Sequence, residues 1–173
     1  MEEKNVLTAL REALPGGVLE TGESFGDPLV ADNPVVADDP VVRIQPEALL
    51  SAAGFLKAEP WSYTMLLDAT CVDYPDRPGR FEMIYHFFSL ARNRRIRIKA
   101  ALPSEHPEIG SLSGLWKNAD WLEREIFDMF GVRFSGHPDL RRLFMYDGFE
   151  GHPLRKDYPL RKRQPLFNKR ETS

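Results

Sequence analysis

Three carboxylates lie close together within residues 121–131, and acidic side chains at this spacing can do chemistry. Glu123, Glu125 and Asp128 would fall within two turns of one helix. Two such groups on one helix face can share a proton in general acid–base catalysis or coordinate a metal ion. No nucleophile, glycine-rich phosphate loop or third metal ligand lies nearby in the sequence. We therefore favour a polar helix face, with Arg124 facing Asp128 one turn on, that also contacts a partner protein.

Two histidines, His137 and His152, stand in Gly-His-Pro triplets that could suggest a zinc site. Their separation matches no common short ligand spacing, and no cysteine lies near either of them. Glycine before and proline after each histidine favour turns. The single cysteine, Cys71, can form no internal disulfide and cannot supply the four thiolates of an ordinary iron–sulfur cluster. We predict no resident metal site and a reducing compartment.

Charge is distributed unevenly along the chain. Residues 1–60 carry 4 Lys/Arg against 11 Asp/Glu, whereas residues 141–173 carry 9 against 4. A basic C-terminal segment suits nucleic acid, an anionic membrane surface or an acidic protein partner. No nucleic-acid-binding motif accompanies it, and the acidic N-terminal region would repel a polyanion, so we expect no nucleic acid. No uninterrupted apolar run approaches the ~20 residues of a membrane span, so we expect none.

The elements that must position these residues begin with helix and loop patterns. Helical spacing and end signals predict helices over residues 5–14, 46–55 and 111–130. Asn5 is placed to cap the first of them. The acidic stretch 18–40 is rich in Asp, Gly and Pro, and only Val35-Val36 could seed a strand within it. We predict a loop there, which leads into an edge strand at 41–45.

Three runs rich in apolar and β-branched residues predict strands over residues 63–72, 81–90 and 95–100. In the last run, Ile96 and Ile98 would face the core. The basic side chains that alternate with them would face outward, namely Arg95, Arg97 and Lys99. Short linkers favour hairpins and hence a small, mostly antiparallel sheet. With flanking helices on one face and the other face partly wet, the predicted fold class is α+β.

The last predicted helix carries clear end signals. Asp120 and Glu123 have the spacing of a capping box, and Gly131 is placed as the left-handed residue that ends the helix. An apolar stripe at helical spacing runs along it and consists of Leu122, Ile126, Met129 and Phe130. A stripe of this kind is typical of a helix that packs on a core.

Regular periodicity fades beyond this helix. Prolines make a long helix or a central strand improbable there, at Pro138, Pro153, Pro159 and Pro165. Many apolar side chains are scattered through the same basic stretch, which is therefore too apolar for a solvated linker. We divide the chain into an α+β domain at 1–136, with an acidic region at 1–40 and the sheet and helices at 41–136. An extended segment at 137–173 would then lie against a partner.

Three stretches of sequence together resemble a known family. They are Trp121-Leu-Glu-Arg-Glu-Ile-Phe-Asp-Met-Phe-Gly131, Gly136-His-Pro-Asp-Leu-Arg-Arg-Leu143 and Glu150-Gly-His-Pro-Leu-Arg-Lys-Asp-Tyr-Pro-Leu160. Over these residues the chain closely resembles the 30 kDa subunit, or NuoC, family of NADH-quinone oxidoreductase, respiratory complex I. The resemblance implies a structural subunit of the hydrophilic arm with no active site or cofactor of its own. NADH, FMN, iron–sulfur clusters and quinone would be bound elsewhere in the complex.

The resemblance also implies a location and a set of partners. The chain would be peripheral, on the cytoplasmic side of the cell inner membrane, in a proton-translocating complex. Its neighbours would be the complex I subunits D, B and I, and its C-terminal segment would lie along the first of these, which helps form the quinone cavity. We therefore expect partner contacts from the motif residues Glu123, Arg124, Glu125, Asp128, His137, Arg141, Arg142, His152, Arg155, Lys156, Asp157 and Tyr158.

Two alternatives stay open at this point. The chain could be the equivalent part of a related machine: the photosynthetic NDH-1 complex, where the counterpart is the J subunit, a coenzyme F420-dependent dehydrogenase or a membrane-bound hydrogenase. It could instead be a free-standing acid–base enzyme that uses Glu123, Glu125 and Asp128. That interpretation requires a pocket with a perturbed carboxyl group, and a helix face covered by a partner would exclude it.

Overall fold

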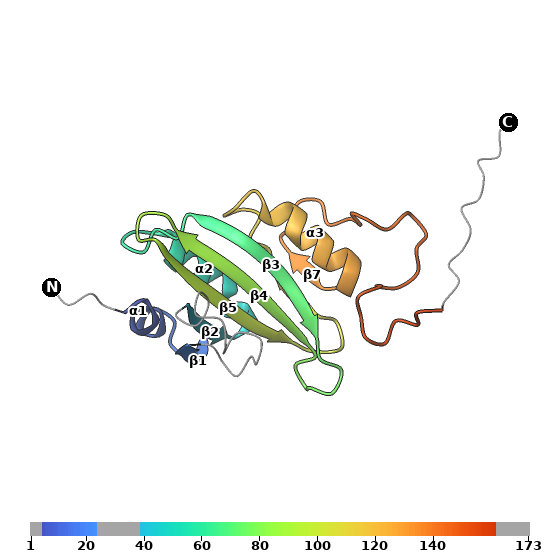
Figure 1. The fold of residues 1–173 in the computed structure, drawn as a ribbon, viewed down its shortest axis with the longest axis horizontal. Helices are drawn as coiled ribbons and strands as arrows, with labels where there is room; N and C mark the ends of the chain where they lie inside the picture. The colour runs from blue at the N-terminus through green and yellow to red at the C-terminus, as the bar shows by residue number, and fades with distance from the viewer. Residues whose placement is uncertain (1–4, 24–38, 162–173) are drawn as a thin grey trace.

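A five-stranded sheet with helices packed on one face forms the core of the computed structural model, which describes residues 5–23 and 39–161 (Figure 1). In spatial order its strands are β1 (Val18–Glu23), β2 (Pro40–Ile44), β5 (Arg94–Leu102), β4 (Phe81–Ser89) and β3 (Met65–Asp73). Strands β2 and β5 pair in parallel, and the other neighbours pair antiparallel. The α+β class is therefore confirmed, with a mixed sheet that is mostly antiparallel.

The helices are α1 (Val6–Ala13), the short 3-10 helix η1 (Pro46–Ala48), α2 (Leu49–Lys57) and α3 (Ala119–Phe130). Asn5 caps α1 by accepting a hydrogen bond from the Leu7 N–H, as predicted. In Figure 1, α2 crosses behind β4 and β5, and α3 lies along β3. The helices cover a fully buried row of large side chains from β4, which consists of Phe81, Met83, Tyr85 and Phe87. None of the helices in the described ranges has the length and apolar character of a membrane span.

Strand β1 corrects two predictions about the N-terminal region. The predicted loop at 18–40 begins instead with a strand, and the strand predicted at 41–45 is not an edge, because β2 lies between β1 and β5. An edge strand such as β1 is stabilised by pairing with its neighbour, which a local pattern does not reveal. The predicted strand seed Val35-Val36 lies outside the described residues.

The outward-facing basic residues of β5 are less exposed than the alternation predicts. Arg95 is exposed, but Arg97 and Lys99 are buried, although they occupy the sheet face opposite the helices. Glu82 of β4 lies between Lys99, at 3.3 Å, and Arg43 of β2, at 3.1 Å. Long side chains that pair across neighbouring strands cover one another, so a charged pattern on a strand does not by itself predict contact with water.

The helix predicted from residue 111 begins only at Ala119, and the capping box is wrong. The residue before the helix, Asn118, makes no side-chain capping bond to it. Its amide donates instead to the Leu66 carbonyl at the edge of β3. Residues 111–118 form turns that follow β6 (Glu108–Gly110), which pairs in parallel with β7 (Arg133–Ser135). At the other end of α3, Gly131 adopts a left-handed φ of 75°, as predicted.

No helix or strand occurs in residues 137–161, which agrees with the predicted irregular segment. We call these residues the strap. In Figure 1 the strap passes around α3, and the Leu154 N–H donates to the Met129 carbonyl on that helix. The predicted division of the chain at residue 136 stays a prediction.

Gly131→Ala should destabilise the isolated chain more than a backbone effect alone explains. A non-glycine residue in the left-handed region costs about 1–2 kcal/mol. A Cβ at Gly131 would also lie within 2.6 Å of atoms in the His152 and Arg155 side chains of the strap. We expect the free energy of unfolding, measured with urea, to fall by more than this backbone cost.

Gly136→Ala is the matched control, because Gly136 has a similar φ of 82° and no atom near the added methyl group. Its loss should be limited to the backbone strain. Equal losses at the two glycines would show that the strap does not pack against the end of α3.

Candidate functional site

The carboxylate of Asp128 is the centre of the contact between α3 and the strap. It is fully buried, and one oxygen accepts hydrogen bonds from three consecutive backbone N–H groups, those of Leu143 (3.0 Å), Phe144 (2.7 Å) and Met145 (2.8 Å). The other oxygen accepts from Arg142 Nη1 at 2.8 Å. Successive N–H groups that converge on one oxygen form an anion-binding nest. The strap therefore folds around this carboxylate.

Two opposing effects act on the pKa of Asp128. Burial by itself raises it, whereas the backbone bonds and Arg142 favour the charged form. Together these bonds outweigh burial and hold the pKa below its ordinary value. The carboxylate is therefore ionised at neutral pH and acts as a fixed acceptor.

Arg124 contributes to the same contact, but not through Asp128. Its Nε donates to the Arg141 carbonyl at 3.2 Å and its Nη2 to the Arg142 carbonyl at 3.3 Å. Its guanidinium also lies 5.0 Å from the centre of the Trp121 ring. The predicted pairing of Arg124 with Asp128 one turn away is therefore wrong: Arg142, a strap residue, is the cation of that pair.

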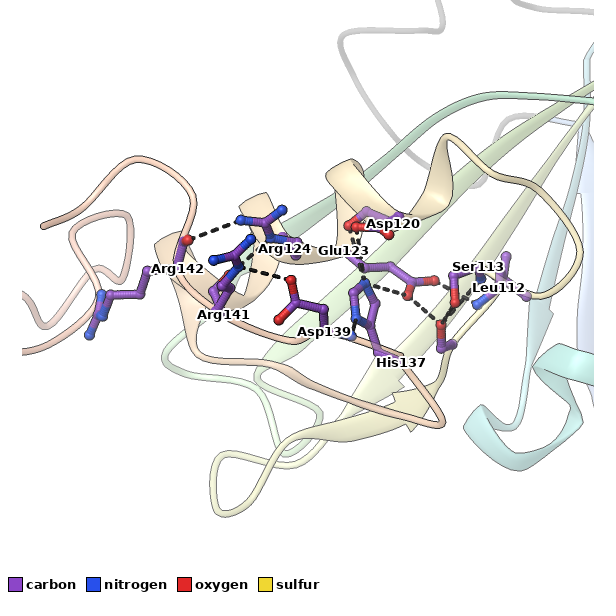
Figure 2. A network of polar contacts seen from close by, with 10 residues as sticks. Leu112, Ser113, Asp120, Glu123, Arg124, His137, Asp139, Arg141 and Arg142 are labelled. Atoms are coloured by element: carbon purple, nitrogen blue, oxygen red, sulfur yellow. Dashed lines mark hydrogen bonds and ion pairs between the residues drawn. The ribbon is translucent and has the colours of Figure 1, made fainter. Parts of the chain in front are cut away.

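Glu123 is also fully buried, and it points toward the turn before α3 and toward His137 (Figure 2). Its carboxylate accepts from the Ser111 hydroxyl and from the Leu112 N–H, each at 2.6 Å. Burial raises the pKa of Glu123, while the two hydrogen bonds oppose that effect. The capping-box pattern predicts that Glu123 bonds the start of its own helix. Glu123 bonds the turn before α3 instead.

His137 lies beside Glu123 and connects the start of the strap to α3 (Figure 2). Its Nδ1 accepts from the Asp139 N–H at 3.0 Å, so in the neutral ring Nε2 carries the proton. Nε2 then donates to the Asp120 carbonyl at 3.2 Å and lies 3.9 Å from the Glu123 carboxylate. The turn predicted at this Gly-His-Pro triplet is confirmed, with Gly136 at a positive φ.

Strap side chains also bond the last carbonyls of α3. His152 Nδ1 donates to the Asp128 carbonyl at 3.0 Å, and Arg155 Nε donates to the Phe130 carbonyl. Burial lowers the pKa of His152, which favours its neutral form. The last carbonyls of a helix have no partner within the helix, and a cation there also meets the negative end of the dipole. Since α3 has no basic residue in its last turn, the strap supplies that cation.

The far end of the strap is fastened to the sheet. Asp73, at the end of β3, accepts from the Lys156 N–H at 2.8 Å and from Arg80 Nε at 2.7 Å. Arg80 also contacts Asp157 at 2.9 Å. The bonds from Arg80, the larger effect, and from the Lys156 N–H lower the pKa of Asp73 despite its burial. Neither Asp73 nor Arg80 was predicted from the sequence, since nothing in a local pattern signals a contact across 83 residues.

The twelve predicted partner-binding residues thus separate by environment. Their side chains are buried at Glu123, Arg124, Asp128 and His137, half-buried at Arg142, His152, Arg155 and Tyr158, and exposed at Glu125, Arg141, Lys156 and Asp157. The exposed Arg141 pairs with Asp139 at 2.8 Å, and the Tyr158 ring stacks on Phe149.

The arrangement holds a chain segment in place. Glu123 and Asp128 are covered by groups of this chain, and their pKa values move in opposite directions for structural reasons. Only Glu125, of the three carboxylates, is exposed. Among residues 5–23 and 39–161, no three His, Cys, Asp or Glu side chains are grouped to hold a metal ion.

Asp128→Asn should release the strap while the sheet stays folded. The amide keeps the shape but cannot accept from all four donors, and removing one partner of a buried ion pair typically costs ~3–5 kcal/mol. Because Arg142 is partly exposed, we expect a loss near ~3 kcal/mol in urea denaturation. Limited proteolysis should cleave residues 137–161 first.

Glu125→Gln, an exposed change on the same helix, is the control and should alter the free energy of unfolding by less than about 0.5 kcal/mol.

In the wild type, the folded pKa of Asp128 lies below its unfolded value of about 3.9. The stability it contributes is therefore complete above that pH and is lost as the pH falls through the folded pKa. If the strap of Asp128→Asn resisted protease as well as the wild-type strap does, that result would contradict the role of Asp128 in holding it.

Comparison with known proteins assigns the fold and the motif to one family. The family model described as respiratory-chain NADH dehydrogenase, 30 kDa subunit, matches residues 42–164. The C 2 subunit of NADH-quinone oxidoreductase from Rhizobium etli (strain CIAT 652) is 46% identical over 148 residues, which cover 84% of this chain and 78% of the relative. The C subunit of the same enzyme from Roseiflexus sp. (strain RS-1) is 39% identical over 168 residues, which cover 96% of this chain and 90% of the relative.

A solved structure is similar as well. The trypsin-resistant fragment of Nqo5 matches with a TM-score of 0.62 and 28% identity, over 78% of this chain and 98% of that one. The family match extends through the strands from β2 onward, α3 and the strap, and so includes all three stretches that suggested the resemblance. The chain therefore belongs to the family of the 30 kDa subunit of respiratory-chain NADH dehydrogenase, as its motifs predicted.

Proposed function

We propose that this chain is a non-catalytic, structural subunit of the peripheral arm of a proton-translocating NADH:quinone oxidoreductase. It would dock on the subunits that form the quinone site and stabilise them. The observation that supports this most is the division of roles on α3 and the strap. Polar motif side chains turn inward and hold the strap, whereas large apolar side chains on the same two elements face solvent.

The exposed apolar residues are those a protein interface would use. Trp121 on α3 is 59% exposed and Phe144 on the strap is 60% exposed; Leu154 and Leu160 are also exposed. Large apolar side chains exposed on one helix and the segment packed against it suit a protein interface, and tryptophan and arginine are enriched among the residues that carry binding energy. Arg124, held beneath Trp121 by two strap carbonyls, would keep that ring in position.

The predicted partner-binding residues fit this proposal in two ways. The exposed charges at Glu125, Arg141, Lys156 and Asp157 would contact partner subunits directly, as the polar rim of the interface. The buried side chains would act indirectly, by fixing the path of the strap. The complex I subunits D, B and I are the proposed partners, the first of them along the strap.

The proposed location and cofactor assignment follow from the same family membership. The chain would be peripheral, on the cytoplasmic side of the cell inner membrane. NADH, FMN, iron–sulfur clusters and quinone would be bound by other subunits. The single buried Cys71, whose pKa burial raises to about 12, supports this assignment, because a protonated thiol is a poor metal ligand.

The double variant Trp121→Ser, Phe144→Ser should impair assembly without unfolding the isolated chain. Both side chains are exposed in the free chain, so thermal denaturation should change little. In the complex each would bury about 150–250 Å². In membranes from a strain that carries the variant, we expect less assembled complex on native gels and a matching loss of NADH:quinone reductase activity.

Leu90→Ser provides the control. Leu90 is 71% exposed in the turn between β4 and β5, at the end of the sheet far from the strap (Figure 1). It should leave assembly and activity unchanged. Normal assembly of the double variant would overturn the proposed interface, and normal assembly with lost turnover would favour a direct catalytic role instead.

A further inference from the structure

A pocket lies at the end of the molecule away from the strap. In Figure 1, α1, the last residues of α2 and the turn between β4 and β5 gather at that end. The cavity that their side chains line has a volume of about 500 Å³. Sites for small molecules have volumes of about 300–1,000 Å³, so this cavity is large enough to hold one.

Apolar side chains form most of the pocket wall. Ala9 and Ala13 come from α1, Phe55 from α2, and Pro60 and Trp61 from the segment after α2. The ring centres of Phe55 and Trp61 lie 6.0 Å apart, with the rings tilted by 37°. Neighbouring aromatic rings offer a ligand a large apolar contact area. The wall therefore favours a ligand with an aromatic body.

Trp61 is fixed in place before any ligand binds. Its backbone N–H donates to the Ala58 carbonyl at 3.0 Å, and its carbonyl accepts from the buried Ser89 hydroxyl at 3.0 Å. Most of its ring is buried, since only 7% of the residue is exposed. A wall that is already ordered lowers the entropy cost of binding.

Arg92, in the turn between β4 and β5, places a positive charge at this wall. Its Nε donates to the Pro60 carbonyl at 2.8 Å, and its guanidinium lies 5.0 Å from the centre of the Trp61 ring. Within residues 5–23 and 39–161, its two terminal nitrogens make no hydrogen bond or ion pair. A guanidinium held in one position can bind a carboxylate through two parallel hydrogen bonds.

Glu12 of α1 also lines the pocket and limits the charge that a ligand can carry. Its carboxylate would repel a second anionic group on the ligand. The pocket therefore suits a molecule with one carboxylate better than a polyanion such as a nucleotide.

We propose that this pocket binds a small aromatic molecule with a single carboxylate. The aromatic body lies against Phe55 and Trp61, and the carboxylate pairs with the terminal nitrogens of Arg92. This inference goes beyond the proposed function and does not depend on it, because none of the residues that line the pocket belongs to α3 or the strap.

Titration of the full chain, labelled with ¹⁵N, tests the site with two probes. They are 2-naphthoate and 2-naphthamide, which share the same rings but differ in charge. The assigned indole N–H signal of Trp61 reports binding at this wall. We expect 2-naphthoate to bind with a dissociation constant of about 1 mM or lower, as a ligand of this size allows. The amide should bind about fivefold more weakly, because it lacks the ion pair with an exposed arginine.

Three variants locate the binding. Arg92→Gln should weaken 2-naphthoate about fivefold and leave 2-naphthamide unchanged. Arg95→Gln, a matched control at an exposed position outside the pocket, should change neither. Ala13→Trp fills the cavity from an exposed position on α1, so the chain should fold with little change in melting temperature while both probes bind at least about tenfold more weakly.

Three results would overturn the inference. If neither probe moved the Trp61 signal, the pocket would not be a binding site. If 2-naphthoate bound Arg92→Gln as tightly as the wild type, the carboxylate would not pair with Arg92. If Ala13→Trp bound both probes with wild-type affinity, the probes would bind outside the cavity.

Discussion

The hydrogen bonds to one buried carboxylate, that of Asp128, determine the shape of the C-terminal half of this chain. An acidic residue near the end of a helix is unfavourable, because it adds negative charge where the helix dipole is already negative. The strap resolves this conflict. It brings three backbone N–H groups and Arg142 to the carboxylate, and His152 and Arg155 to the neighbouring carbonyls. A segment without helix or strand is thereby fixed in one path.

The two buried carboxylates of α3 show how environment separates residues of the same type. Glu123 is enclosed with two donors, and burial dominates, so its pKa rises. Asp128 is enclosed with four donors, one of them an arginine, and its pKa falls. Opposite shifts of this kind can mark an acid and a base in an enzyme. In this chain each pKa shift follows from the segment that the carboxylate holds. Glu123 holds the turn before α3, and Asp128 holds the strap after it.

The parts of this molecule that local patterns govern could be predicted from the sequence. The strands β3, β4 and β5, the cap at Asn5 and the left-handed Gly131 follow from alternation and end signals. Prediction failed where a side chain had two possible partners. Glu123 could cap its own helix or bond Ser111, and Arg124 could face Asp128 or the strap carbonyls. The other segment supplied buried donors to Glu123 and carbonyl acceptors to Arg124. These decided both choices, because an unsatisfied buried polar group costs more than a lost exposed pair.

The roles of the motif residues within the chain could not be predicted from their types alone. The sequence predicts these residues as partner contacts because they are charged or can form hydrogen bonds. In the structure, several of the most polar side chains point inward and hold the strap. The exposed Trp121 and Phe144 carry no polar signal. Their exposure is a tertiary property, so a single sequence could not reveal it.

Hydrogen exchange at the amides of Leu143, Phe144 and Met145 in the isolated chain tests the central claim most directly. These three N–H groups reach one carboxylate oxygen of Asp128 before any partner binds. We predict exchange on the order of 100-fold slower than in an unfolded peptide of the same sequence, since bonds to a charged acceptor are individually worth about 1.5–3 kcal/mol. Exchange of all three amides at the unfolded rate would contradict the claim, because the strap would then be free until a partner orders it.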